Sequence, residues 1–365
     1  MSDLDVRFAR LADERDSRRS SARALVGRWD WYTWPGLDPR PLHFERDLLA
    51  PGRRLDTRPP ADQGVLRIGF DADGRPVVIE EYSGFLHGRL HYETFLRYDG
   101  DLAEAAHYDP DRPIYLHEYH FEGGLMRSAE MVARGGSGRE TYTYADGRIS
   151  RVAIEDDRRS RSVLTAEHDD AGLFRLVETA GGRSEVRYER PPTGFDLGAA
   201  CRDIEDTLVR LIPAAAAGLA ADGPVDCIAL SYHLPAELSV EICAATAEER
   251  AALRSIDAPA AWAPADFTAV AEVAADDTAA LRLVRQELTL LDTRDHDVAA
   301  GSEAGRRLLC AVAARLNDHD WPGTLPVTDD FLVYAVDLEL ADLHRNLTDC
   351  LTPDQLARAR ERGLL

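Results

Sequence analysis

With 365 residues, 45% hydrophobic and 30% charged, the chain has the composition of a folded protein long enough for two independent cores. No stretch reaches the roughly 18 uninterrupted apolar residues of a membrane-spanning helix, and the N-terminus lacks the pattern of a signal peptide. The net charge of -22 disfavours binding to nucleic acid or to an anionic membrane, so we expect a cytoplasmic protein with neither as a partner.

The negative charge is concentrated in the C-terminal part. Residues 193–365 contain 14 Arg and 30 Asp and Glu, a net charge of -16, whereas residues 1–192 carry -6. Such a field would speed association with a basic partner. Solubility alone would also explain the charge, and we weigh the two explanations equally.

Residues 1–60 are predicted to form a helix followed by an irregular, aromatic connection. The helix is expected over about 3–27, where apolar residues recur weakly among many charges. Trp31 and Trp34 belong to an aromatic cluster that begins at Trp29. Such residues most often complete a core, and less often they form a binding hot spot.

Residues 61–192 are predicted to form an antiparallel β-meander of repeated hairpins. Turn pairs recur after short alternating segments, at 73–74, 99–100, 123–124 and 146–147. Asp-Gly and Gly-Gly pairs supply the positive φ that tight hairpins need. Units of this kind bury their faces only against neighbouring units, so a single continuous sheet is expected.

The phrases from Tyr144 to Arg148 and from Phe70 to Arg75 resemble the YD repeats of Rhs-type proteins. The short strands are also similar to antitoxin-like repeat proteins of bacteria. The resemblance implies β architecture only, because any surface meander reuses the same turn chemistry.

Residues 193–365 are predicted to form an α+β domain, a mostly antiparallel sheet covered by helices. Asp196 is placed to cap a helix that Pro213 kinks or ends. Residues 225–233 and 237–243 alternate like an antiparallel hairpin whose outer strand has one face open to water. Residues 267–273 are expected to add a third strand, and helices are expected around 281–291 and 308–316.

The run from Phe331 to Val336 is apolar on both alternate faces, which is typical of a central strand covered on both sides. Capping-box patterns at Thr246 and Thr352 predict the starts of two further helices, and Gly363 is expected to end the second. The overall fold class is therefore α+β, with a β-meander before an α+β domain.

All five cysteines lie after residue 193, and none forms a C-x-x-C pair. We interpret them as buried free thiols, which suits a reducing compartment. His117 and His120 could contribute to a metal site, but a spacing of three on a strand sends them to opposite faces. No metal or other cofactor is predicted, and Asp71 to Gly74 is explained by a tight turn.

Acidic residues crowd the predicted strand and helix ends of the C-terminal domain. A partner-binding surface is predicted at Asp292, Asp295, Asp297, Asp318, Asp320, Asp329, Asp330, Asp337, Glu339 and Asp342, with Trp31 and Trp34 as a second candidate. Carboxylates with histidines can also hold a cation or perform acid–base chemistry. No nucleophile elbow, phosphate loop or metalloprotease helix occurs, so no catalytic residue is assigned and a binding protein is favoured over an enzyme.

The segments 309–316, 317–321 and 325–337 and the closing helix resemble an uncharacterised family of bacterial α+β domains. Members of that family are often assigned as immunity proteins of polymorphic toxin systems. The resemblance implies a protein that binds and neutralises a toxin, for example a basic nuclease. A metal-assisted hydrolase and an adaptor module remain the alternatives, and the residues set no oligomeric state.

Overall fold

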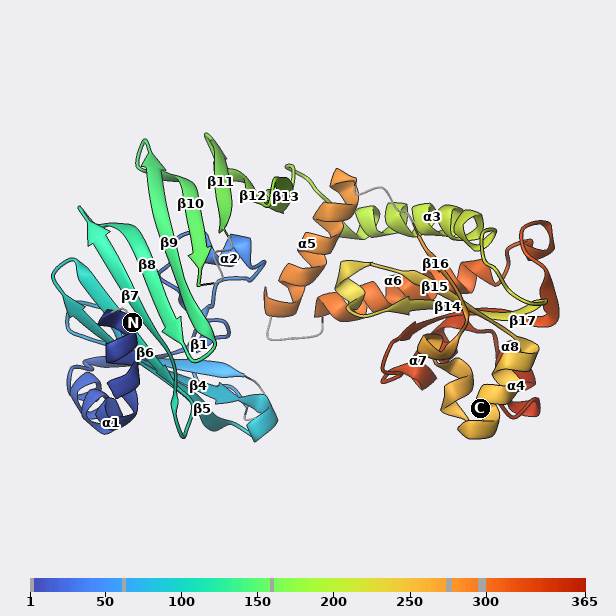
Figure 1. Ribbon diagram of the computed structural model, residues 1–365, viewed down its shortest axis with the longest axis horizontal. Coiled ribbons are helices and arrows are strands. Elements are labelled where there is room, and N and C mark those ends of the chain that lie inside the picture. The colour runs from blue at the N-terminus through green and yellow to red at the C-terminus, as the bar shows by residue number, and fades with distance from the viewer. Residues whose placement is uncertain (1–2, 61–63, 158–160, 274–277, 295–299) are drawn as a thin grey trace. The chain divides into compact units, whose positions relative to one another are not determined.

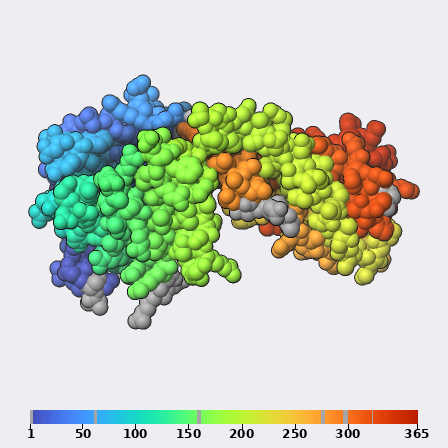
Figure 2. Space-filling view, turned by 90° about the horizontal axis from the view of Figure 1, so that it is seen from above, coloured from blue at the N-terminus to red at the C-terminus, as the bar shows by residue number. Residues whose placement is uncertain are grey.

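The computed structural model describes residues 3–60, 64–157, 161–273, 278–294 and 300–365. Contacts divide the chain into two compact units. Unit 1 covers residues 1–190 together with 293–296, and unit 2 covers the remaining residues from Pro191 onward. The colours in Figure 2 run from blue to green through unit 1 and from yellow-green to red through most of unit 2.

Unit 1 is built on a 13-stranded sheet in which all paired strands are antiparallel. From β13 to β3, neighbours in the sequence are neighbours in the sheet, and β1 and β2 complete it (Figure 1). The strands are β1 (Arg28–Thr33), β2 (Arg54–Leu55), β3 (Val65–Phe70), β4 (Pro76–Ser83), β5 (Arg89–Asp99), β6 (Leu102–Tyr108), β7 (Pro113–Glu122), β8 (Leu125–Ala133), β9 (Gly136–Ala145), β10 (Arg148–Asp156), β11 (Arg161–Asp169), β12 (Gly172–Ala180) and β13 (Arg183–Glu189).

The turn residues explain this order. Gly74 and Gly147 have φ values of 79° and 74°, which residues with a Cβ atom rarely adopt. The Asp71 carboxylate accepts hydrogen bonds from the backbone N–H groups of Asp73 and Arg75, at 3.0 and 2.8 Å, as a tight turn requires. The predicted β-meander is therefore confirmed. The connection before residue 60, which was expected to be irregular, contains the short helix α2 (His43–Arg46). The 3-10 helix η1 (Gly84–Leu86) joins β4 to β5.

The predicted N-terminal helix is α1 (Asp3–Ala24), which lies against β4, β5, β7 and β8 of the sheet. Its Leu4, Leu11 and Ala22 are buried, and five of its arginines also form ion pairs with acids of the sheet. Arg7 and Arg18 both pair with Glu104 of β6, and the Nε of Arg19 donates to Glu93 of β5 at 3.0 Å. The apolar periodicity of α1 is weak because ion pairs form much of its contact with the sheet.

Unit 2 contains a four-stranded sheet in the order β16-β15-β14-β17. Two of its three strand pairs are antiparallel, and β14 and β17 are parallel. This confirms the predicted α+β class with a mostly antiparallel sheet. Its elements are α3 (Leu197–Ala216), β14 (Val225–Tyr232), η2 (Pro235–Glu237), β15 (Glu241–Thr246), α4 (Ala247–Ile256), η3 (Pro259–Trp262), η4 (Pro264–Asp266), β16 (Ala269–Glu272), α5 (Ala279–Arg294), α6 (Ala300–Leu316), η5 (Trp321–Gly323), β17 (Val327–Asp337), α7 (Leu343–Cys350) and α8 (Pro353–Glu361).

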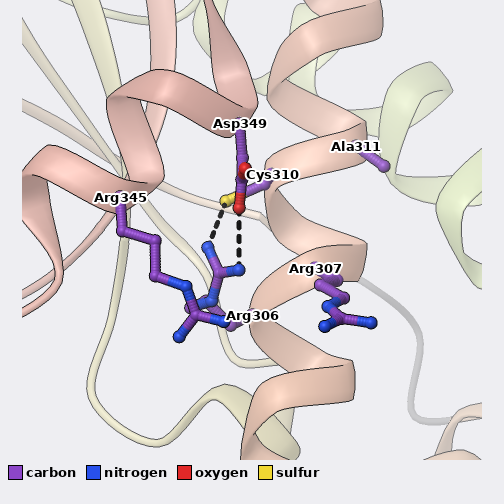
Figure 3. A pocket seen from close by; sticks show the side chains of 6 residues that line it. All are labelled: Arg306, Arg307, Cys310, Ala311, Arg345 and Asp349. Carbon is purple, nitrogen blue, oxygen red and sulfur yellow. Dashed lines mark hydrogen bonds and ion pairs between the residues drawn. The ribbon is translucent and has the colours of Figure 1, made fainter.

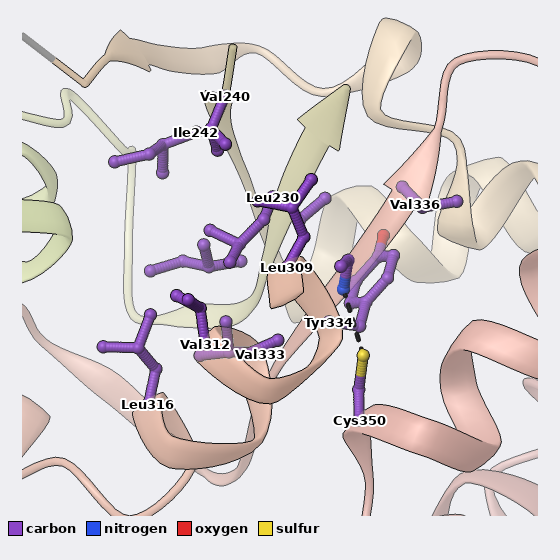
Figure 4. Close-up of a cluster of buried hydrophobic side chains, with 14 of the residues drawn as sticks. Leu230, Val240, Ile242, Leu309, Val312, Leu316, Val333, Tyr334, Val336 and Cys350 are labelled. Atoms are coloured by element: carbon purple, nitrogen blue, oxygen red, sulfur yellow. Dashed lines mark hydrogen bonds between the residues drawn. The ribbon is translucent and has the colours of Figure 1, made fainter. Parts of the chain in front are cut away.

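The apolar run from Phe331 to Val336 lies in β17, but β17 is an edge strand, so the prediction of a central position is wrong. Leu332 to Val336 are buried on both faces, as predicted: Val333 lies beside Val312 of α6 (Figure 4), and Tyr334 contacts Trp262 on the other face.

The open edge of β17 is bonded by side chains. Asn317 accepts a hydrogen bond from the backbone N–H of Val333 and donates one to its carbonyl oxygen, both at 2.8 Å. The N–H of Ala335 donates to the Sγ atom of Cys350 at 3.4 Å. Because both faces of β17 are covered and side chains bond its open edge, an edge strand can have the apolar composition of a central strand.

Three local predictions also needed correction. Pro213 lies inside α3, which continues to Ala216, so the proline does not end this helix. The second hairpin strand begins at Glu241 and not at residue 237, and β16 lies outside it in the sheet. Its residues from Ile242 to Ala245 are buried, so no face is open to water there. The side-chain caps at Asp196, Thr246 and Thr352 are confirmed, and so is the positive φ of Gly363.

Candidate functional site

The predicted acidic surface of unit 2 falls at the two ends of β17. Around its first residues lie Asp318, Asp320, Asp329 and Asp330. At its last residue and just after it lie Asp337, Glu339 and Asp342. Along β17, Asp337 comes seven residues after Asp330, which corresponds to roughly 23 Å. The structure therefore does not bring all these acids into one continuous surface.

We call the first group, Asp318, Asp320, Asp329 and Asp330, the acidic end. The ring of Trp321 contacts Phe331 at 5.3 Å between centroids and His319 at 5.1 Å. This packing holds the turn after α6 beside the start of β17. Asp318, Asp320 and Asp329 are exposed and form no ion pair with the described residues, whereas Asp330 lies 3.6 Å from Arg358.

An irregularity in β17 places Asp329 and Asp330 here. Val327 pairs with Val225, and the next pair joins Leu332 to Cys227, so four residues of β17 oppose one residue of β14. Extra residues of this kind break the ladder and redirect side chains, and they are frequent at functional sites. The position of Asp329 and Asp330 therefore depends on the irregular backbone of β17 as well as on the acidic residues themselves.

The other predicted acids have local structural partners or lie elsewhere. Asp337 accepts hydrogen bonds from three backbone N–H groups, those of Glu339, Ala341 and Asp342, at 3.0 to 3.1 Å. Asp292 accepts hydrogen bonds from the backbone N–H groups of Gly301 and Ser302, at 2.8 and 2.9 Å, at the start of α6. Asp295 and Asp297 lie outside the described residues.

The two tryptophans of the second candidate surface differ in environment. The Trp31 ring contacts Tyr82 at 5.5 Å between centroids, and the guanidinium of Arg58 lies 5.3 Å from it, so the ring is half-buried. Trp34 is 46% exposed. Packing explains Trp31, and only Trp34 offers a free aromatic surface.

Sequence reasoning missed a row of titratable and aromatic side chains across β4 to β7, which we call the aromatic–histidine face. Paired positions carry Glu81 and Tyr92, and further along the row the ring of His107 stacks on Tyr115 at 4.4 Å with an angle of 8°. The row contains Glu81, Tyr92, His107, Tyr115, His117 and Tyr119. His120 pairs with Glu118 at 2.8 Å and lies on the other face, as predicted.

Burial shifts the pKa values of three groups on this face. It raises the pKa of Glu81 to about 7, and among the described residues no hydrogen bond or neighbouring charge opposes this effect of burial. Burial lowers the pKa values of His107 and His117 to about 4. At neutral pH the imidazoles are therefore uncharged, and Glu81 is divided between its two protonation states.

Replacing Glu81 with glutamine should raise the stability of unit 1 at pH 8 by about 1 to 2 kcal/mol and have little effect at pH 4. The pKa of Glu81 is about 7 in the folded chain against an ordinary 4.5, so the folded state binds more protons in that window and loses stability as pH rises through it. The difference can be measured by unfolding the chain in urea at several pH values between 4 and 8, with amide hydrogen exchange in β4 as the readout.

His107→Gln provides the opposite test. The pKa of His107 is about 4 in the folded chain against an ordinary 6.5, so its contribution is present above pH 6.5 and is lost as pH falls toward 4. The variant should lose part of this acid sensitivity. Parallel pH profiles for the original chain and both variants would contradict the assigned shifts.

The alternation of Tyr115, His117 and Tyr119 along β7 was visible in the sequence as one face of a strand. Glu81 and His107 could not be joined to it, because the register of β4, β5 and β6 is a property of the fold. In the described residues, no group of three or more His, Cys, Asp or Glu side chains is arranged to hold a metal ion. The five thiols are free, as predicted, but only four of them are buried, because Cys201 is half-buried.

None of the helices in the described residues is long and apolar enough to cross a bilayer. No family model matches the chain, and no curated protein matches it. Among solved structures, a porin-like protein from Bacteroides uniformis is similar over 44% of this chain and 58% of that chain, with 10% identity and a TM-score of 0.27. A likeness this weak carries no functional argument.

Proposed function

We propose that the chain is an immunity-type binding protein that neutralises a basic bacterial toxin through the acidic end. The observation that supports this proposal is the cluster of exposed carboxylates of Asp318, Asp320 and Asp329, which have no cationic partner in the described residues. Carboxylates in such a position can replace substrate phosphates against the Arg and Lys side chains of a nuclease.

The net charge of unit 2 fits this role, because a charged surface accelerates encounter with an oppositely charged partner. No described group of metal-ligating side chains favours the alternative of a metal-assisted hydrolase. The exposed side chain of Trp34 would suit an adaptor. The acidic end therefore receives the first test.

Reversing two charges in Asp320→Arg plus Asp329→Arg should weaken binding to the cognate basic toxin about 10- to 100-fold, mostly through slower association. Both side chains are exposed and free of ion pairs with the described residues, so folding should be retained. Surface plasmon resonance at several salt concentrations measures the effect, and rescue of growth during toxin expression measures neutralisation.

Glu339→Arg plus Asp342→Arg is the matched control, because it makes the same charge change at the opposite end of β17. That variant should bind almost as tightly as the original chain. Equal weakening by both variants would mean that only net charge matters. Binding that is indifferent to salt, or a chain that fails to protect cells against the basic toxin that it binds, would refute the proposal.

A further inference from the structure

A hollow of about 470 Å³ on the surface of unit 2 has a cysteine in its wall (Figure 3). Residues of α6 and α7 line it, including Arg306, Arg307, Cys310, Arg345 and Asp349. The Sγ atom of Cys310 lies 3.5 Å from the Nη1 atom of Arg306. A guanidinium donor at this distance favours the thiolate over the thiol.

Arg306 is held in place by other groups. Its Nη2 atom lies 2.7 Å from Asp349 and its Nε atom 2.9 Å from Glu303, and its Nη1 atom also donates to Asn346 at 2.7 Å. The side chain is only 3% exposed. The cation beside Cys310 is therefore fixed, and it cannot swing away into solvent.

A second thiol lies next to the first. Cys350 at the end of α7 lies one helical turn after Asn346, whose Oδ1 atom is 3.7 Å from the Sγ atom of Cys310, and Cys350 lines an adjoining hollow of about 570 Å³ that shares Asp349 with the first one. The hydrogen bond from Cys350, assisted by Arg306, lowers the pKa of Cys310, and the same bond raises the pKa of Cys350. Cys310 is therefore the more acidic thiol of the pair.

The other cysteines have different environments. Burial raises the pKa of Cys227 to about 11 and that of Cys243 to about 12, and it also raises the pKa of Cys201. Cys201 is the most exposed of the five, yet no described arginine donates a hydrogen bond to its sulfur. Exposure alone would thus predict Cys201 as the most reactive thiol, whereas the surroundings of the sulfur atoms predict Cys310.

We propose that Cys310 is a hydroperoxide-reactive site and that Cys350 is its resolving thiol. The Cys310 thiolate attacks one peroxide oxygen, so that an S–O bond forms, the O–O bond breaks, and the departing oxygen leaves with a proton as water or an alcohol. Cys350 then attacks the oxidised sulfur, an S–S bond forms, and hydroxide leaves with the Cys350 proton as water. The two thiols are oxidised by two electrons and the peroxide is reduced.

Hydrogen peroxide added to the purified full-length chain tests this assignment, with dimedone as the trap for sulfenic acid. In Cys350→Ser, which removes the resolving thiol, dimedone should label Cys310 on the order of tenfold faster than Cys201. In the unchanged chain, peptide mapping should recover a Cys310–Cys350 disulfide. Cys310→Ser should abolish both products.

Arg306→Met should slow labelling of Cys310 on the order of tenfold, because the thiolate loses its cationic donor. Arg307→Met is the matched control, since Arg307 lines the same hollow but its Nε atom donates to Glu303, at 2.6 Å, and not to the sulfur. Thermal unfolding shows whether Arg306→Met remains folded. If that variant does not fold, the labelling of Cys350→Ser still tests the proposal. Labelling of Cys201 ahead of Cys310 in Cys350→Ser would overturn the proposal.

Discussion

Replacing Asp226 with alanine is expected to lower the stability of unit 2 by about 3 to 5 kcal/mol, the largest effect of any single substitution that we predict. Asp226 is 1% exposed and lies at the start of β14. Its carboxylate is 2.7 Å from the Nη1 atom of Arg250 and 2.9 Å from the Nη2 atom of Arg362. The hydroxyl of Thr328 donates a further hydrogen bond at 2.9 Å.

The loss is large because Arg250 is fully buried. Its guanidinium lies 4.5 Å from the centre of the Trp262 ring and has no other carboxylate partner in the described residues. Without Asp226 a charge would remain in the core uncompensated. Burial acts to raise the pKa of Asp226, but Arg362 and Arg250 hold it below its ordinary value of 3.8. The contribution is therefore present above that pH and is lost as pH falls below it.

Native-state hydrogen exchange of the β14 amides measures this change without requiring the two units to unfold together. Asp222→Ala is the matched control, since it removes the same charge from an exposed position just before β14. The double variant Asp226→Ala plus Arg250→Met should recover part of the loss, because it removes both charges. Equal stability of the Asp226→Ala and Asp222→Ala variants would contradict the assigned role.

Replacing Asn317 with alanine is expected to lower the stability of unit 2 by about 2 to 4 kcal/mol. Besides its two hydrogen bonds to Val333, the Asn317 amide donates to the carbonyl oxygens of Ala313 and Cys350, at 3.0 and 3.2 Å. Alanine would leave the polar backbone groups of a buried edge strand without partners. The substitution should therefore act mainly on β17.

Amide exchange at Val333 gives a direct local readout, because its N–H donates to the Asn317 Oδ1 atom. Asn317→Asp is the informative comparison: it keeps an acceptor for this N–H but loses the donors to the three carbonyl groups. We expect Val333 to stay protected in Asn317→Asp and to exchange faster in Asn317→Ala. Unchanged protection in both variants would show that another group covers this edge.

Several local features could be predicted because their causes lie within a few residues. The caps at Asp196, Thr246 and Thr352 depend on a side chain and a backbone N–H group three positions away. The hairpins of unit 1 follow from turn glycines at positive φ, and burial of β17 follows from apolar side chains on both of its faces. These determinants are short-range, so the residues alone specify them.

Long-range register and edge partners could not be predicted. The position of β17 at the sheet edge depends on Asn317 and Cys350, which come from two different helical segments. Glu81 joins the aromatic–histidine face only through pairing of β4 with β5, and Cys310 meets Cys350 across α6 and α7.

The sequence by itself therefore determined the β-meander, the α+β class, the caps and the concentration of negative charge in unit 2. Only the tertiary structure decided which acids lie together, because the segment of β17 in which four residues oppose one of β14, and the packing of Trp321 on Phe331, gather one group at the start of β17. The tertiary structure also decided that Cys310 lies near Cys350 and that Glu81 joins the aromatic–histidine face. The physical reason is that alternation assigns a side chain to a face, whereas only the pairing of distant segments brings it to a neighbour.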